Sequence, residues 1–267
     1  MPIPTHTPND AGQIPSLAFG TGTAAINIGF TYFDGAQRYK NEATLGAAIR
    51  PSESSVPRSE LFISTKHASL TPGETAKTAL YKSLEKLGLE YVDLYLVHAP
   101  KDHMDGCGDG LKEVWKGLTR SIGVSNFGVE HILEIVEGAQ VLPAVNQPLI
   151  KVHKEHGIVT SSYGGLSPLF RAPGGPLDHV VEKIRARLED TWGKPVTSGQ
   201  VLNKWLLQHD ILVVTYVFVR CCAVIREHVD TCDVPELTSE EMGLIQSAGA
   251  GRNQSFFKNT EYCLREI

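Results

Sequence analysis

Eight short apolar runs, separated by segments with helical periodicity, limit the folds that this chain can adopt. The runs are rich in Val, Ile, Leu and Phe and mostly do not alternate between apolar and polar residues, which predicts strands buried on both faces. Strands that alternate with helices form parallel α/β folds, and a parallel barrel takes about 250 residues. The chain has 267 residues, so we expect one barrel domain over residues 1–267. The expected strands are 16–23, 30–36, 61–66, 92–98, 121–126, 143–147, 157–163 and 212–217.

Apolar residues at spacings of three and four predict helices between the strands. Pro72 suits the first turn of a helix that we expect over residues 71–87. Only six residues separate Thr23 from Phe30, whereas a crossover between parallel strands takes about a dozen or more. We therefore expect a shortened first crossover without its helix. The stretch 171–176, which contains Gly and Pro, predicts a long loop from strand to helix. The other expected helices are 129–136, 178–192, 198–208 and 237–247.

Composition and charge argue against several classes of function. The net charge is -5 and the Lys and Arg residues are scattered, so we expect no nucleic-acid partner. No apolar stretch approaches the roughly 20 residues of a membrane span, and the polar start of the chain does not resemble a signal peptide. We expect a cytoplasmic protein that does not bind membranes. The five cysteines have no CxxC spacing, which supports neither a disulfide framework nor a zinc site, and we expect no metal.

Four polar residues lie at or just beyond the ends of expected strands. Asp34 ends one apolar run and Tyr39 follows it in the chain, while Lys66 and His98 end the next two runs. The carboxyl ends of strands in a parallel barrel converge on one mouth. These four side chains can therefore form a single site.

Proton donation is the chemistry that this set of residues favours. A free tyrosine, with a pKa of about 10, is a poor acid near neutrality, but a neighbouring ammonium group lowers that pKa. A carboxylate such as Asp34 keeps a buried lysine charged, and an imidazole such as His98 can donate a hydrogen bond to a carbonyl oxygen. Each residue alone is more often a rim residue with a satisfied hydrogen bond. Together they suit the reduction of a carbonyl group.

The motifs that contain these residues resemble the aldo-keto reductase family, in the same order and from about residue 14 to residue 241. The resemblance implies a (β/α)8 TIM barrel that transfers hydride from NADPH to an aldehyde or ketone. It implies Tyr39 as the general acid, tuned by Lys66 and Asp34, with His98 orienting the carbonyl. Relatives that reduce a steroid carbon-carbon double bond have a glutamate at the His98 position, so the histidine favours carbonyl reduction. The motifs are Phe19-Gly20-Thr21-Gly22-Thr23, Asp34-Gly35-Ala36-Gln37 through Tyr39 and Asn41-Glu42, Ser64-Thr65-Lys66, Leu96-Val97-His98, Ser121-Ile122-Gly123-Val124-Ser125-Asn126-Phe127, Val145-Asn146-Gln147 and Tyr163-Gly164-Gly165-Leu166-Ser167-Pro168-Leu169.

Polar groups suited to a nicotinamide cofactor follow the later strands. Ser125, Asn126 and Gln147 can supply the donors and acceptors that a carboxamide needs, and Tyr163 offers a ring face for stacking. The glycines of the turn 164–167 allow backbone amides to approach a pyrophosphate, although a plain turn is the alternative. The resemblance assigns the same roles. The expected cofactor contacts are Thr23, Asp34, Ser125, Asn126, Gln147, Tyr163, Gly164, Leu166, Ser167, Arg220, Arg226 and Glu227.

The chain departs from the family where relatives bind the 2′-phosphate of NADPH. Val224 stands at the usual arginine position. Arg220 or Arg226 is a candidate replacement because a guanidinium suits phosphate, although either is equally well interpreted as a solvated helix charge. Glu227 is better placed to meet the adenine end. We expect NADPH as the cofactor and leave NADH open.

Two further segments, 113–121 and 148–150, are shorter than in relatives and support rival hypotheses. One is a catalytically silent cofactor-binding barrel or a degenerate family member. Another is an aldolase in which Lys66 forms a Schiff base with a carbonyl substrate. The expected partner is a small-molecule carbonyl compound, whose identity depends on the segments 102–109 and 170–176 and on an exposed tail over 248–267. The sequence predicts no oligomeric state.

Overall fold

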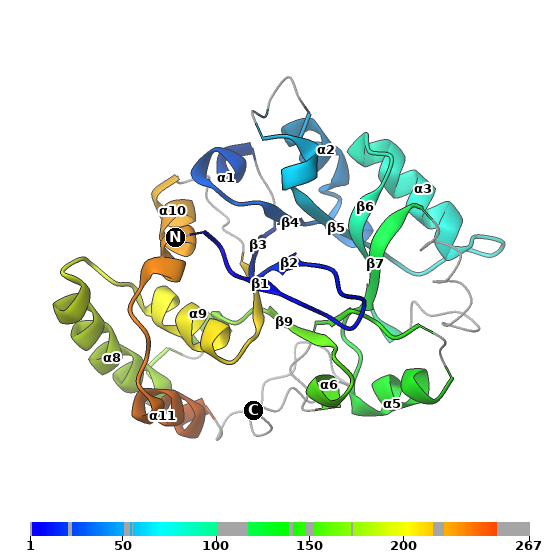
Figure 1. Ribbon diagram of the computed structural model, residues 1–267. Coiled ribbons are helices and arrows are strands. Elements are labelled where there is room, and N and C mark those ends of the chain that lie inside the picture. Colours follow the sequence, from blue (N-terminus) through cyan, green and yellow to red (C-terminus); the bar gives the residue numbers. More distant parts are fainter. Residues whose placement is uncertain are drawn as a thin grey trace.

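Eight parallel strands form a closed barrel at the centre of the molecule (Figure 1). The computed structural model describes residues 2–20, 23–50, 54, 56–100, 117–138, 141–147, 152–171, 173–215 and 222–249. The order of the strands around the barrel follows the chain, and the last strand pairs with the first. This arrangement confirms the predicted (β/α)8 TIM barrel. Its strands are β3 (Leu17–Phe19), β4 (Tyr32–Asp34), β5 (Phe62–His67), β6 (Val92–Val97), β7 (Thr119–Val124), β8 (Val145–Asn146), β9 (Val159–Tyr163) and β10 (Leu212–Thr215).

Helices surround the barrel, as Figure 1 shows, and cover the outer face of its strands. The apolar side chains form two clusters, a large one that includes helix residues such as Leu80 and Leu188, and a smaller one that includes Leu94, Leu96 and Leu212 from the strands. Strands that contact apolar residues on both faces require the near-continuous apolar runs of the sequence. The helices are α1 (Thr23–Ile28), α2 (Glu42–Ala48), α3 (Ala76–Leu87), α5 (Val129–Gly138), α6 (Val152–Glu155), α7 (Ser167–Arg171), α8 (Pro176–Trp192), α9 (Ser198–Gln208), α10 (Cys222–Asp230) and α11 (Ser239–Gly249), with short 3-10 helices η1 (Gln37–Tyr39), η2 (Arg58–Glu60) and η4 (Thr231–Asp233).

Strand register places the predicted site residues at one rim of the barrel. His67 pairs with Val97, Val97 with Val124 and Val124 with Asn146, so these residues lie at one level. The residues that follow three of these strands are His98, Ser125 and Gln147. Consecutive strands therefore deliver the polar side chains to the carboxyl end of the barrel.

An amino-terminal hairpin, formed by β1 (Thr5–His6) and β2 (Ile14–Pro15), lies across the opposite end of the barrel (dark blue in Figure 1). Asn9 hydrogen-bonds through its backbone N–H to the carbonyl of Gly157 at 2.9 Å and through its side-chain amide to the carbonyl of Pro143 at 3.1 Å. The sequence did not predict this hairpin. It covers the amino end and leaves the carboxyl end for a site.

The predicted absence of the first helix is wrong. β3 ends at Phe19 rather than at Thr23, so residues 20–31 remain for the crossover, and the short helix α1 fits within them. α1 packs against α10. The crossover is short but contains its helix.

Most elements differ from their predicted bounds by a few residues, and the differences are larger at α3 and in the segment 171–176. α3 begins at Ala76, because Gly73 has a left-handed φ of +82° and the hydroxyl of Thr75 caps the helix by accepting from the N–H of Thr78 at 3.2 Å. Much of the predicted long loop 171–176 is also helical or a tight turn, since α7 ends at Arg171 and α8 begins at Pro176.

Several sequence predictions fall on residues outside the described part of the chain. These are the substrate loop 102–109, residues 113–116 of the shortened segment 113–121, the shortened segment 148–150, and the tail beyond residue 249. Among the residues that are described, no helix is long and apolar enough to span a membrane.

Candidate active site

Asp34, Tyr39, Lys66 and His98 meet at the carboxyl end of the barrel, as the strand-end pattern predicts. Asp34 ends β4, Lys66 lies in β5 and His98 follows β6. The ammonium nitrogen of Lys66 lies 4.9 Å from the centroid of the Tyr39 ring. The ring of His98 meets that of Tyr39 edge-on, with centroids 5.2 Å apart and an interplanar angle of 84°. The phenol, the ammonium group and the imidazole therefore share one small volume.

A buried ion pair lies beneath Tyr39. The Lys66 side chain is 0% exposed, and its Nζ donates to Oδ2 of Asp34 and, at 3.3 Å, to the carbonyl oxygen of Gly35. The hydroxyl of Ser64 donates to the other carboxylate oxygen, Oδ1 of Asp34, at 2.6 Å. Buried charges need such partners, because removing one leaves the other uncompensated at a cost of about 3–5 kcal/mol. The pair thus fixes a positive charge next to the tyrosine.

Tyr39 and Tyr32, the two tyrosines close to Asp34 in the chain, differ in their exposure to solvent. Tyr39 is 37% exposed, whereas Tyr32 is 2% exposed inside the barrel. Burial, together with the Asp34 carboxylate, raises the pKa of Tyr32. Tyr32 therefore keeps its proton, and Tyr39 is the better candidate for donating one to a bound molecule.

A second polar group follows β7 and β8 at the same rim. The hydroxyl of Ser125 donates to the amide oxygen of Gln147 at 3.0 Å, and the amide nitrogen of Asn126 donates to the Ser125 hydroxyl at 2.9 Å and to the carbonyl oxygen of His98 at 2.8 Å. Asn126 has a left-handed backbone with φ of 62°, a conformation that asparagine tolerates better than most residues. The structure thus joins the three predicted nicotinamide contacts to one another and to His98.

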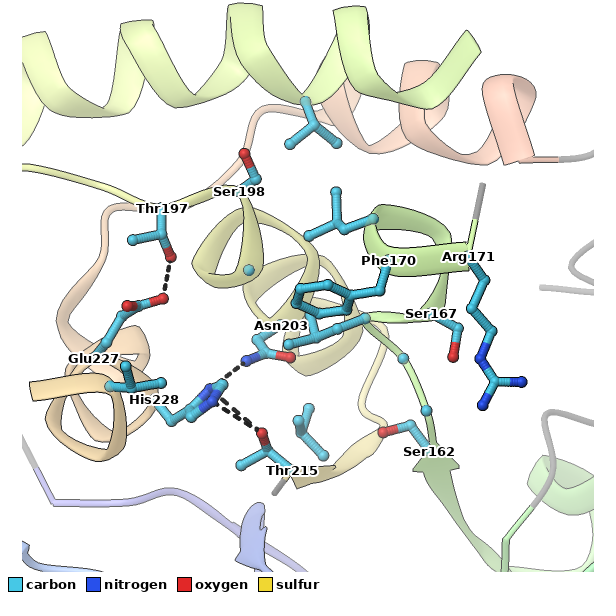
Figure 2. Close-up of a pocket in the computed structure, with 18 of the residues that line it drawn as sticks. Ser162, Ser167, Phe170, Arg171, Thr197, Ser198, Asn203, Thr215, Glu227 and His228 are labelled. Atoms are coloured by element: carbon cyan, nitrogen blue, oxygen red, sulfur yellow. Dashed lines mark hydrogen bonds between the residues drawn. The ribbon is translucent and has the colours of Figure 1, made fainter. Parts of the chain in front are cut away.

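A cavity of about 1030 Å³ opens beside β9 and β10 (Figure 2). Its walls come from the turn after β9, from α7 and α8, from the start of α9 and from α10. The predicted residues Gly164, Leu166, Ser167 and Glu227 line it. The backbone N–H of Ser167 donates to the carbonyl of Gly164 at 2.8 Å, and Gly164 has a φ of +69°, which closes a tight turn at the wall.

Hydrogen-bonded polar side chains form one wall of the cavity, as Figure 2 shows. The carboxylate of Glu227 accepts from the hydroxyl of Thr197. The imidazole of His228 contacts the hydroxyl of Thr215 through Nε2 at 3.2 Å and the amide nitrogen of Asn203 through Nδ1 at 3.3 Å. Burial lowers the pKa of His228 to about 4. The imidazole is therefore neutral near pH 7 and can both donate and accept hydrogen bonds.

Comparison with known proteins decides the family. The model of the aldo/keto reductase family matches residues 10–160. An aldo-keto reductase of Mycolicibacterium vanbaalenii is 37% identical, with 93% of this chain and 93% of that protein covered. The chain belongs to the aldo-keto reductase family. The sequence-based identification is thus confirmed, and the protein is an oxidoreductase of that family.

Other proteins are similar to this aldo-keto reductase in sequence or in fold. An NAD/NADP-dependent indole-3-acetaldehyde reductase of Schizosaccharomyces pombe is 31% identical, with 76% of this chain and 81% of that protein covered. The structure of an aldose reductase from Schistosoma japonicum matches with a TM-score of 0.78 at 26% identity over 97% of this chain and 98% of that one. The silkworm aldo-keto reductase AKR2E5, complexed with NADPH, matches with a TM-score of 0.77 at 26% identity over 91% of this chain and 87% of that one.

Not every predicted cofactor contact of this aldo-keto reductase lies at the described cavity. The guanidinium of Arg226 donates to the carbonyl of Ile28 at 3.3 Å, at the end of α1, and Arg226 is not among the lining residues. Arg220 and the side chains of Thr23 and Tyr163 lie outside the described part of the structure.

Some residues that line the cavity carry no signal in the sequence. Thr197 and Ser198 begin α9, Asn203 lies one turn further along it, and Thr215 ends β10. The capping pattern of Thr197 and Gln200 predicts a helix start but carries no signal of a binding site. Only the packing of α9 against β10 and α10 brings these residues to the cavity.

Proposed function

We propose that this aldo-keto reductase reduces an aldehyde or ketone to an alcohol with NADPH, and that Tyr39 is the general acid. The observation that carries the proposal is the convergence of the Tyr39 ring on the Lys66 ammonium group and the His98 imidazole, at 4.9 Å and 5.2 Å. Protein groups of these three kinds at one barrel mouth suit the transfer of a proton to a carbonyl oxygen.

Each side chain has a separate part in that transfer. The substrate oxygen binds between the Tyr39 hydroxyl and His98, which donates a hydrogen bond to it. Tyr39 then gives its proton to the oxygen as the carbonyl carbon becomes tetrahedral, and the phenolate that remains is stabilised by the Lys66 ammonium group. Asp34 holds Lys66 in place through their buried ion pair.

The donor set of the described residues fits a nicotinamide dinucleotide such as NADPH. When bound, NADPH supplies the hydride that adds to the carbonyl carbon. Ser125, Asn126 and Gln147 offer amide and hydroxyl groups to the carboxamide of the nicotinamide. The cavity offers the turn 164–167 to the pyrophosphate and Glu227 to the adenine end. The complex of the silkworm relative with NADPH supports this choice of cofactor, while NADH stays open.

The environment of Lys66 does not favour the Schiff-base alternative. A lysine attacks a carbonyl carbon as a neutral amine, which is commonly achieved by desolvation or by a nearby positive charge. Lys66 is instead paired with the Asp34 carboxylate. A lysine held in a buried ion pair suits an electrostatic role rather than attack on a carbonyl carbon.

The proposal is tested by incubating the folded protein with NADPH and a panel of small aldehydes and ketones. Loss of NADPH absorbance, with one alcohol formed for each NADPH consumed, is the expected result. NADPH binding is measured in parallel by the quenching of tryptophan fluorescence. Protein that binds NADPH but consumes none with any carbonyl compound would refute the proposal and favour the silent binding barrel.

A further inference from the structure

The side chain of Gln37 joins the turn that carries Tyr39 to two neighbouring parts of the fold. Its amide nitrogen donates to the backbone carbonyl of Ala79 and to the hydroxyl of Ser83, both on α3 and both at 3.1 Å. Its amide oxygen accepts from the backbone N–H of Ala68, just after β5, at 3.1 Å. A primary amide has two N–H donors and one acceptor oxygen. Gln37 therefore uses both donors and its oxygen in contacts with elements other than its own.

The hydrogen bonds within the turn that carries Tyr39 are of the weaker 3-10 kind. η1 is a single 3-10 turn, with hydrogen bonds from the N–H of Tyr39 to the carbonyl of Ala36 at 3.1 Å and from the N–H of Lys40 to the carbonyl of Gln37 at 3.2 Å. Hydrogen-bond geometry in 3-10 turns is poorer than in α-helices. The Tyr39 side chain is exposed by more than a third, so apolar packing holds it only in part.

Two amide side chains anchor this turn from opposite sides. On the side of β3, the amide nitrogen of Asn41 donates to the carbonyl of Gly20 at 3.0 Å, and its oxygen accepts from the N–H of Ala36 at 3.2 Å. On the side of α3 and β5, the anchor is Gln37. Ser83 is fully buried, so the hydrogen bond that it accepts from Gln37 is shielded from water.

The Gln37 amide also connects the segment of Tyr39 with the segment of Lys66, the two residues that must lie close together for the proposed proton transfer. Gln37 lies two residues before Tyr39, and its acceptor bond ends at Ala68, two residues after Lys66. We propose that Gln37 is a positioning residue, whose three hydrogen bonds hold the Tyr39 hydroxyl at the Lys66 ammonium group and the His98 imidazole. This inference rests on the proposed role of Tyr39 as the general acid.

The test replaces Gln37 by methionine, which keeps the length of the side chain and removes all three hydrogen bonds. We expect kcat to fall about tenfold to a hundredfold, because small displacements of a reacting group have effects of this size. Separation of Tyr39 from Lys66 weakens the stabilisation of the phenolate, so the alkaline limb of the pH profile moves to higher pH. The dissociation constant for NADPH stays unchanged, since Gln37 contacts none of the residues assigned to the cofactor.

Gln208 provides a matched control. It is partly buried like Gln37, and its amide makes two hydrogen bonds with the backbone of Leu237, donating to the carbonyl at 3.1 Å and accepting from the N–H at 2.7 Å. Gln208→Met therefore removes a comparable set of bonds at the end of α9, outside the proposed site. We expect it to lower stability while leaving kcat and the pH profile as in the parent protein.

A milder variant keeps the test decisive if Gln37→Met does not fold. Ser83→Ala removes only one of the three bonds and should produce a smaller fall in kcat with the same direction of pH shift. Parent-like kcat and pH profile in folded Gln37→Met, or in Ser83→Ala if only that variant folds, would overturn the positioning role. Full activity of Tyr39→Phe would instead refute the proposed function, so the two failures are distinguishable.

Discussion

Acid should destabilise this protein through His153, a buried histidine at the outer side of the barrel. His153 is 1% exposed, and its ring bridges two side chains, with Nε2 at 2.9 Å from the amide nitrogen of Asn146 and Nδ1 at 2.9 Å from the hydroxyl of Thr160. The same amide nitrogen donates to the carbonyl of Phe127 at 2.9 Å, which fixes the orientation of the amide. Nε2 must therefore accept a hydrogen bond, and a protonated ring cannot do so.

The size of this loss of stability follows from the pKa of His153. Burial lowers the pKa of His153 from 6.5 to about 4. At a pH between these two values, His153 is protonated in the unfolded chain but not in the folded chain. The free energy of unfolding therefore decreases as the pH falls through that range. Each pKa unit corresponds to about 1.4 kcal/mol. The free energy of unfolding therefore falls by about 3 kcal/mol once the pH is below both pKa values, and by about 2 kcal/mol between about pH 7 and about pH 5.

The assay is urea unfolding, followed by circular dichroism, of the parent protein and of His153→Gln. Glutamine does not titrate, and its Oε1 can accept from Asn146 in place of Nε2. Between about pH 7 and about pH 5, the free energy of unfolding should fall by about 2 kcal/mol more in the parent than in this variant. His179 on α8 is exposed, so His179→Gln should keep the pH dependence of the parent. Identical pH dependence in the parent and in His153→Gln would refute this reasoning.

Two further perturbations test the packing at the proposed site. Lys66→Met leaves Asp34 buried without its partner and should lower the free energy of unfolding by about 3–5 kcal/mol. In urea unfolding, Asp34→Asn combined with Lys66→Met should recover much of that loss. A double variant as unstable as Lys66→Met would contradict the importance of the ion pair. Asn126 has a left-handed backbone, so Asn126→Ala should be less stable than Asn126→Gly by about 1 kcal/mol, although both lose the bond to the carbonyl of His98. Equal unfolding midpoints of the alanine and glycine variants would count against backbone strain at this position.

The sequence predicted the barrel well because buried parallel strands leave a strong pattern. α9 matches its predicted range of residues 198–208, since Thr197 and Gln200 form a capping box and the apolar periodicity is regular. α1 was missed because Gly20 to Thr23 were counted as strand, and a helix of six residues offers too few turns for a periodic pattern. The hairpin β1–β2 has strands of two residues each, which is too short for any alternation.

The proposed catalytic part of the candidate site was predictable for a different reason. Asp34, Lys66 and His98 lie at or next to the carboxyl ends of consecutive strands, so the barrel geometry brings them together. The cavity residues Asn203 and Thr215 carry no such signal, since their place depends on how α9 packs against the barrel. Gln37 is likewise visible in the sequence only as part of a turn, because its partners Ala79 and Ser83 lie on a helix distant in the chain.

The role of Tyr39 as the general acid is tested by the rate of NADPH oxidation by Tyr39→Phe with an aldehyde that the parent protein reduces. The substitution removes the hydroxyl and keeps the ring against Lys66 and His98. If Tyr39 is the proton donor, kcat falls by about 10²-fold to 10⁴-fold, the usual contribution of general acid catalysis, while NADPH binds as in the parent. Turnover at the parent rate would contradict the assignment of Tyr39 as the proton donor.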